Sequence, residues 1–434
     1  MLDINFIRNN KEKVAAAIKN KGYAGEIDLE NILSLDESRK KLSGELDDLR
    51  QKRNEISASI KNGKPDQSLI EKGKELKVQI SEKEKILSEI KDNFTRELKK
   101  VPNIPTDDVP IGLSEDENVV AEICGEPTKF DFEPKNHYEI GTVRDWIDKE
   151  RAAKISGARF AYIKGELVQL QMAIVNWVMN TLSDEEKIKE IVEKNNLNVS
   201  TKPFRLVLPP LMLRTEVYDS MDRLEPREDR YKIEGEELWL QGSAEHVLGS
   251  MHSGEILPEK DLPIRYLGYA TSFRQEAGTY GKDMEGIIRM HQFDKMEMES
   301  FSTKETSFNE HLFFVAIQRY LVEQLKLPYR VIQKCTYDIG KPDARGIDIE
   351  VWLPGQNKYR ETHTADYMTD YQTRRTETKV RREDGSIELT HTNDATAFAL
   401  GRIMVAIIEN YQNENCTIKV PEVLKPYLNN KEEI

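Results

Sequence analysis

Residues 266–299 read YLGYATSFRQEAGTYGKDMEGIIRMHQFDKMEME, and this stretch predicts an antiparallel β-hairpin. Two strand-like runs flank the glycine-rich segment 277–286, which fits a long loop between paired strands. Side chains alternate across a strand, so each run presents two different faces. Small residues and then two charged ones share a face of the first run: Gly268, Ala270, Ser272, Arg274 and Glu276. In the second run Arg289, His291, Phe293, Lys295 and Glu297 share a face, and methionines lie opposite.

The polar face of this hairpin has two interpretations. A row of arginine, histidine, lysine and glutamate is costly to bury without polar partners, so the face could simply be solvated. Alternatively, it binds an anionic ligand with a flat ring, with arginines on phosphates, Phe293 stacked on the ring and carboxylates on amines. The chain has no GxGxxG and no GxxxxGK[ST] motif, so a nucleotide would not occupy a Rossmann or P-loop site.

The rest of residues 119–434 mixes helical and strand patterns without regular βαβ alternation. This predicts an α+β fold with a mainly antiparallel sheet, and 166–181 (ELVQLQMAIVNWVMNT) is an expected apolar helix. The run ATAFALGRIMVAIIENY (395–411) is apolar all round and predicts a buried helix, interrupted only by Arg402. A buried guanidinium needs either an anionic ligand or a structural carboxylate partner.

Residues 28–100 show heptad spacing in two halves. Apolar residues recur at alternating steps of three and four on each side of a turn at residues 62–66, Asn-Gly-Lys-Pro-Asp. This predicts an antiparallel coiled-coil hairpin with helices of about 33 residues, hence roughly 50 Å long. We expect a helical arm at 1–105, a proline-containing linker at 106–118 and a catalytic domain at 119–434.

The charge is unevenly distributed. The chain of 434 residues has a net charge of −13, which excludes a uniformly basic nucleic-acid binder. Residues 28–100, however, carry 17 basic and 16 acidic side chains, and residues 50–77 carry eight basic and four acidic ones. The arm is therefore either an ordinary solvated coiled coil or a stalk whose end contacts RNA phosphates. The eight basic residues are Arg50, Lys52, Arg53, Lys61, Lys64, Lys72, Lys74 and Lys77.

The cysteines and apolar runs indicate the compartment. Cys124, Cys335 and Cys416 are scattered and form no CxxC pair, which favours a reduced, cytoplasmic setting. No close His/Cys spacing is present, so we expect no zinc site. The sequence shows neither a signal peptide nor an apolar run of the ~18 residues needed to span a membrane, so we expect no membrane partner.

These motifs together resemble the seryl-tRNA synthetase family of class II aminoacyl-tRNA synthetases. The resemblance covers essentially the whole chain, from the N-terminal hairpin through the linker. VLPPLMLR (207–214) is similar to the class II dimer motif, SFRQEAGTYGKDMEGIIRMHQFDKMEM (272–298) to the second motif and ALGRIMVAIIENYQ (399–412) to the third.

The resemblance implies a fold and a reaction. The fold is an antiparallel sheet flanked by helices, with the coiled-coil arm formed separately. The reaction is ATP-dependent activation of L-serine with Mg²⁺, then transfer to the 3′ end of tRNA(Ser), by a homodimer. Because the serine carboxylate is already ionised, its attack on the α-phosphorus needs no general base.

Site residues follow by matching positions to the family's motifs. The expected ATP site consists of Arg274, Gln275, Glu276, Arg289, Phe293, Glu361, Thr362, His363, Thr364 and Arg402, of which Arg274, Glu361 and Arg402 are the expected catalytic residues. The expected serine site consists of Ser243, Ala244, Glu245, Arg274, Glu297 and Thr396. Glu361 and Thr364 are the expected Mg²⁺ ligands.

The sequence departs from the family pattern at three places. Ser243 replaces a usual threonine, Thr364-Ala365-Asp366-Tyr367 replaces a common Ser-x-Ser-Asn, and Asp394 replaces a usual asparagine. Asp366 and Asp394 add carboxylates near the site, which predicts either added metal affinity or a different hydrogen-bond pattern around the amino acid.

Two other functions compete with serine–tRNA ligation. A relative that activates an amino acid for a carrier protein would lack the arm, whereas this arm is complete in outline. A non-catalytic RNA-binding homologue would have lost residues such as Arg274, Glu361 or Arg402, and all three are present.

Overall fold

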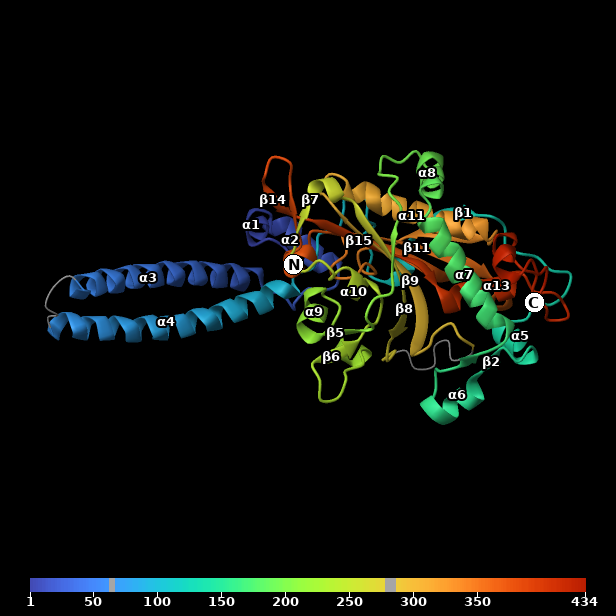
Figure 1. Ribbon diagram of the computed structural model, residues 1–434, viewed down its shortest axis with the longest axis horizontal. Coiled ribbons are helices and arrows are strands. Elements are labelled where there is room, and N and C mark those ends of the chain that lie inside the picture. The colour runs from blue at the N-terminus through green and yellow to red at the C-terminus, as the bar shows by residue number, and fades with distance from the viewer. Residues whose placement is uncertain (62–66, 278–285) are drawn as a thin grey trace. The chain divides into compact units, whose positions relative to one another are not determined.

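The computed structural model describes residues 1–61, 67–277 and 286–434, and these form two compact units, residues 1–104 and 105–434 (Figure 1). The predicted turn at 62–66, which contains Lys64, and most of the predicted loop at 277–286 lie outside the described residues, as does the side chain of Lys61. None of the described helices is long and apolar enough to cross a membrane.

The first unit is helical. It consists of α1 (Ile4–Asn9), α2 (Lys11–Asn20), α3 (Leu29–Lys61) and α4 (Gln67–Lys100). The two long helices pack side by side, with Leu46, Ile80 and Leu87 buried between them at the predicted heptad positions. The predicted pair of long helices is therefore confirmed.

The second unit is built on an eight-stranded sheet with the order β1-β10-β11-β12-β15-β9-β8-β4. Neighbouring strands are antiparallel except the edge pair β4 and β8, which is parallel. This confirms the predicted α+β class. The strands are β1 (Val119–Cys124), β4 (Arg205–Val207), β8 (Ile264–Phe273), β9 (Gln292–Ser302), β10 (Tyr329–Gln333), β11 (Arg345–Leu353), β12 (Lys358–Thr369) and β15 (His391–Ala399).

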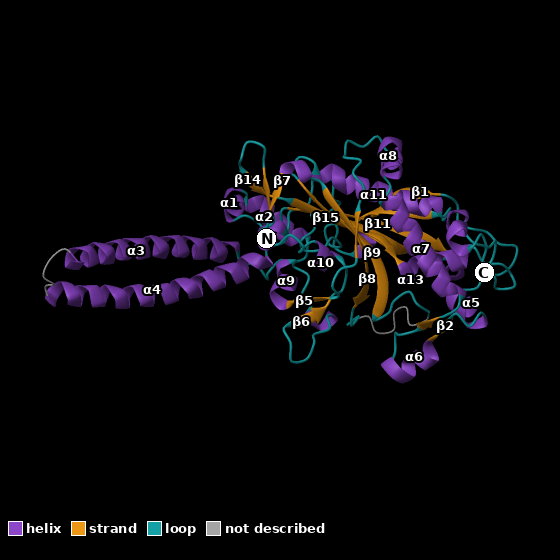
Figure 2. Ribbon diagram, in the orientation of Figure 1, coloured by secondary structure: helices purple, strands orange, loops and turns teal. Residues whose placement is uncertain are grey.

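One face of this sheet carries the main core (Figure 2). Residues of α7 (Glu166–Leu182), α8 (Glu185–Lys194), α11 (Ser307–Gln324) and α13 (Leu400–Asn410) pack there against Met296, Met298 and Phe398. The methionines of the hairpin thus lie on the buried side, as their alternation predicts. The opposite face of the central strands carries polar residues beside a smaller apolar cluster that includes Leu248, Tyr266, Ala270 and Phe301.

Smaller elements complete the second unit. They are α5 (His137–Val143), α6 (Lys149–Ser156), α9 (Thr215–Ser220), α10 (Glu245–Leu248) and α12 (Thr373–Thr376), with β2 (Ile147–Asp148) on β3 (Tyr162–Ile163), β5 (Met212–Arg214) on β6 (Leu238–Leu240), and β7 (Ile256–Pro258) beside β13 (Lys379–Arg381) and β14 (Ile387–Leu389).

The predicted buried helix at 395–411 is wrong at its start. Residues 395–399 end strand β15, and α13 begins only at Leu400. Residues 395–399 read ATAFA and are apolar apart from Thr396, so this short run cannot be told from the start of a buried helix by periodicity. Arg402 consequently lies in the first turn of α13, beside the polar face, where 24% of its side chain is exposed.

Candidate active site

The hairpin of β8 and β9 builds one wall of the site. Gly268 pairs with Glu297, Ala270 with Lys295 and Ser272 with Phe293. The small residues on β8 allow α10 to approach the sheet, because a Cβ on Gly268 would lie 2.8 Å from the side chain of Leu248. Strand β8 ends at Phe273 and β9 begins at Gln292, so Arg274, Glu276 and Arg289 follow or precede the paired strands.

A β-bulge in β12 sets the neighbouring wall. Ile349 pairs with His363 but Glu350 pairs with Glu361, so Thr362 is an extra residue. The bulge brings Glu361 and Thr364, three residues apart, to one face. It turns His363 toward the other face, where its ring centroid lies 5.0 Å from that of Phe398 and burial lowers its pKa to about 3.

These walls enclose a cavity of about 830 Å³ that continues into a smaller hollow. The two share Arg274, Arg289, Lys295, Glu361 and Thr364, and together they form one site. Of the expected ATP residues, the smaller hollow is lined by Arg274, Glu276, Arg289, Phe293, Glu361, Thr362, Thr364 and Arg402.

Three arginines and the ring of Phe293 line the smaller hollow. The Arg274 guanidinium lies 5.4 Å from the centroid of the Phe293 ring. Arg289 forms an ion pair with Glu276 at 3.0 Å, and Arg402 one with Glu361 at 2.8 Å. Burial opposes ionisation of Glu361, but Arg402, Lys334 and Arg274 nearby hold its pKa below the usual range. This end can therefore bind a polyanion that carries a flat ring.

Carboxylates dominate the other end. Ser243 donates a hydrogen bond to Glu297 at 3.2 Å, and Lys295 forms an ion pair with Glu297 at 2.5 Å. Thr396 lies 3.5 Å from the second oxygen of Glu297, and Ala244 is fully buried beside them. Burial raises the pKa of Glu297 although Lys295 opposes the shift.

The pKa of Glu245 is shifted in the opposite direction from that of Glu297. It forms an ion pair with Arg223 at 2.6 Å. Burial opposes its ionisation, but Arg223 and the neighbouring His246 hold the pKa of Glu245 well below the usual range. Glu245 is therefore ionised at neutral pH and suited to bind an ammonium group.

Two expected ATP residues do not line the cavity. Gln275 is exposed and donates a hydrogen bond to the carbonyl of Arg230. His363 lies on the apolar face because of the bulge, which strict alternation from Glu361 would not reveal.

The expected basic residues of the arm are also placed, apart from Lys61 and Lys64. Lys52, Lys72, Lys74 and Lys77 are exposed, and Arg53 is partly so. Arg50 forms ion pairs with Glu84 at 2.8 Å and with Asp47 at 3.3 Å. The free charge of this region consequently comes mainly from the lysines of α4 and from Lys52.

Several cavity residues escaped sequence reasoning. Arg223, Lys334, Asp343 and Asp348 line the larger cavity, and so do Glu115, Asp116 and Asn118 of the expected linker. The register of the sheet explains one of them, since Asp348 pairs with Thr364. Arg223 and the linker residues reach the site through loops, for which no periodic signal exists.

The comparisons with known proteins follow the same division of the chain. Residues 1–105 match the family model described as the seryl-tRNA synthetase N-terminal domain. Residues 229–411 match the tRNA synthetase class II core domain (G, H, P, S and T). The second unit therefore has a class II aminoacyl-tRNA synthetase core.

Individual relatives identify the family within the class II synthetases to which this chain belongs. A serine–tRNA ligase of Thermodesulfovibrio yellowstonii is 39% identical and covers 99% of both chains. The crystal structure of seryl-tRNA synthetase from Pyrococcus horikoshii complexed with ATP is 35% identical, with a TM-score of 0.89 over 100% of this chain and 99% of that one. A cytoplasmic serine–tRNA ligase from Naegleria fowleri in complex with AMP is 26% identical, with a TM-score of 0.83 over 100% and 98%. This chain belongs to the seryl-tRNA synthetase family.

Proposed function

We propose that this chain activates L-serine with ATP and transfers the seryl group to the 3′ end of tRNA(Ser) in cytoplasmic protein synthesis. One observation carries the proposal. A cavity lined by three arginines and a phenylalanine is continuous with one lined by ionised Glu245, so a nucleotide triphosphate and an amino acid can meet in it.

In this mechanism the arginines bind and neutralise phosphates. Arg274 and Glu276 hold the α-phosphate and the adenine end, and Phe293 stacks on adenine. Arg289 and Arg402 hold the terminal phosphates. A serine carboxylate oxygen attacks the α-phosphorus, seryl-adenylate forms and pyrophosphate leaves. Positioning two anions and stabilising the developing charge supplies the rate enhancement.

The carboxylates bind the amino acid. Glu245 accepts hydrogen bonds from the α-ammonium group, and Glu297 with Thr396 recognises the side-chain hydroxyl. A buried site of this kind rejects an analogue that lacks the hydroxyl by about 10⁴–10⁵-fold. Alanine is therefore a poor substrate.

The same face suits Mg²⁺. Glu361 and Thr364 present hard oxygen donors on the side where phosphates would lie, as this ion prefers. When bound, the ion neutralises charge on the phosphates.

Two further parts of the proposal concern macromolecular partners. The exposed lysines of the arm contact tRNA phosphates. The chain is a homodimer through residues 206–212, where exposed Leu206, Leu208, Leu211 and Met212 form an apolar segment.

Pyrophosphate exchange tests the catalytic proposal. L-serine should drive exchange between ATP and labelled pyrophosphate without tRNA, and L-alanine should not. Failure of every standard amino acid to support exchange would refute amino-acid activation by this chain.

A further inference from the structure

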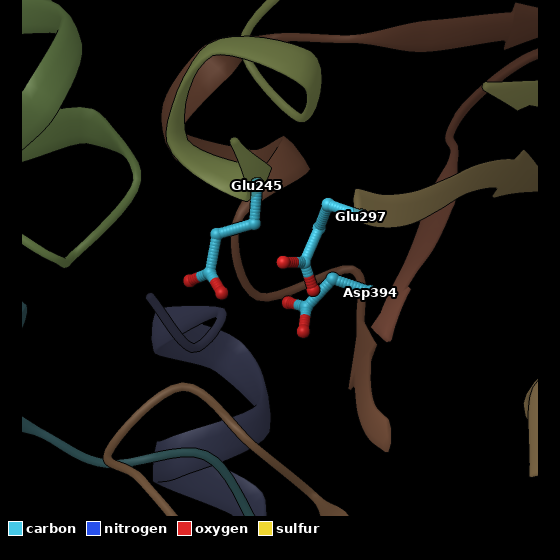
Figure 3. A group of neighbouring side chains, drawn as sticks. All are labelled: Glu245, Glu297 and Asp394. Atoms are coloured by element: carbon cyan, nitrogen blue, oxygen red, sulfur yellow. The ribbon is translucent and has the colours of Figure 1, made fainter. Parts of the chain in front are cut away.

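Beside the proposed ammonium site, carboxylates from three elements converge. Glu245 of α10, Glu297 of β9 and Asp394 of β15 turn their side chains toward one another (Figure 3). One oxygen from each lies within 4.8 Å of the other two, and all three residues are buried. Like charges this close require cations or protons between them.

The described cations cover this cluster only partly. Lys295 forms an ion pair with Glu297. Arg223 is shared among three carboxylates, with Glu245 at 2.6 Å, Asp343 at 3.3 Å and Asp394 at 3.7 Å. Asp394 thus has the longest of these ion pairs, and its Oδ1 is buried without a hydrogen-bond partner.

Two neighbours of Asp394 are similarly unsatisfied. Asp366 lies directly opposite it in the β12–β15 register, lines the larger cavity and has a buried Oδ1 without a hydrogen-bond partner. Glu299 lies opposite Asp394 on the other side, in β9, is 1% exposed, and neither of its oxygens has a hydrogen-bond partner. A buried polar group left in this state costs about 1–3 kcal/mol.

Even with an amino acid bound, the carboxyl groups around the cluster outnumber the cations that face them. Its α-ammonium group would serve Glu245 and release part of Arg223. That leaves Arg223 and Lys334 to face Asp343, Asp348, Asp366 and Asp394 at the side-chain end, so carboxyl groups still outnumber cations there. A hydroxyl adds no positive charge and donates only one hydrogen bond, whereas an ammonium group adds both a charge and three donors.

We propose that the side-chain end of the site takes an L-amino acid whose side chain ends in an ammonium group, with Asp366 and Asp394 as its acceptors. This inference rests on the proposed activation of L-serine and adds a second class of side chain that the same pocket accepts. A metal ion in the cluster is less well supported, because Glu245 and Glu297 already hold cations at 2.6 and 2.5 Å.

The activation step is otherwise unchanged. The α-carboxylate forms a bond to the α-phosphorus, the bond to the pyrophosphate oxygen breaks, and the side-chain ammonium group is not consumed. Short side chains fit best, since Thr396 and Glu297 close the position of a β-substituent. L-2,3-diaminopropionate, the amine counterpart of serine, and L-2,4-diaminobutyrate are suitable probes.

Pyrophosphate exchange with L-serine, both diamino acids and L-alanine decides the proposal. We expect at least one diamino acid to give a kcat/KM at least tenfold above that of L-alanine, which has no polar group on its side chain. Exchange with serine but with neither diamino acid would overturn the inference and leave the proposed function intact. No exchange with any of them would overturn both.

Charge-removing variants test the acceptors. Asp394→Asn should lower the ratio of diamino-acid to serine kcat/KM by about 10-fold to 100-fold, the usual value of a hydrogen bond to a charged group. Asp366→Asn tests the second acceptor if the first variant fails to fold. Asp294→Asn is the matched control, because this residue sits on β9 but bonds Gln171 and Thr271, and the ratio should not change.

A thermal-shift series separates the ligand from a metal ion. The diamino acid should stabilise the full chain more than serine does in the presence of EDTA. Stabilisation by Mn²⁺ alone that Asp394→Asn abolishes would assign the cluster to a metal and overturn the proposal.

Discussion

At the residue scale, Glu299 is a buried carboxyl group whose two oxygens have no hydrogen-bond partner. Burial, with Glu245 and Glu297 nearby, raises the pKa of Glu299 well above its usual range. The native state therefore binds a proton that the unfolded chain has already lost above its ordinary pKa near 4.5. Its contribution lowers the stability of the protein as the pH rises from about 4.5 toward the folded-state pKa.

Glu299→Gln removes this pH-dependent loss of stability. The variant should gain stability relative to the parent as the pH rises from 5 to 8, by on the order of 1–3 kcal/mol. Urea unfolding at several pH values measures the difference. Glu186→Gln, at an exposed position of α8, is the control and should follow the parent curve. A constant difference across the pH range would show that Glu299 titrates normally.

Arg402 carries the second prediction at this scale. It ion-pairs with Glu361 at 2.8 Å and is 24% exposed, so its removal leaves no deeply buried cavity. Arg402→Ala should lower kcat/KM for ATP in pyrophosphate exchange by about 10²–10³-fold, as for other groups that stabilise developing charge, and shift the unfolding midpoint little. Arg319→Ala, which breaks an ion pair with Glu122 of similar length, is the control. Wholesale unfolding of Arg402→Ala would indicate a structural role.

At the scale of elements, the sequence predicts the helices and strands that follow a regular side-chain repeat. It does not predict the places where that repeat is interrupted. Heptads located α3 and α4, and alternation located the two faces of β8 and β9, because a repeating side-chain pattern reflects a repeating backbone. The bulge at Thr362 inserts one residue without a sequence signal and reverses the face of His363. Residues 395–399, at the end of β15, are apolar apart from Thr396, so their pattern cannot be told from that of the helix that follows. Arg223 and the linker residues enter the cavity from loops, so only tertiary structure places them there.

The α4 helix also carries a prediction. Lys72, Lys74 and Lys77 are exposed, so replacing all three by alanine should leave the helix intact. The KM for tRNA in charging should rise about 10-fold to 100-fold, with a shallower salt dependence. Exchange without tRNA should be unchanged. The control replaces exposed Lys154, Lys189 and Lys260 of the second unit. An equal effect of both triple variants would locate the tRNA contact elsewhere.

At the scale of the whole molecule, the net charge of −13 says little about function because it averages unlike parts. The arm is nearly neutral with exposed lysines, while the second unit concentrates carboxylates both on its surface and inside its cavity. The surface excess disfavours nonspecific contact with polyanions. The buried excess lies in the cavity where we propose that the amino acid binds. Net charge alone could predict neither.

Assembly provides the last prediction. Within residues 206–212, Leu208 is 77% exposed and Met212 is 45% exposed. Exposed apolar surface of this kind is typical of a protein–protein interface. Leu208→Asp should place a charge in the proposed homodimer interface, where burying an unpaired carboxylate costs several kcal/mol. Light scattering after size-exclusion chromatography should then report a mass of about one chain rather than two. Ile387→Asp, at a position 48% exposed on β14, is the matched control and should stay dimeric. A parent chain that is already monomeric at micromolar concentration, or a Leu208→Asp variant with unchanged mass, would exclude this segment as the interface.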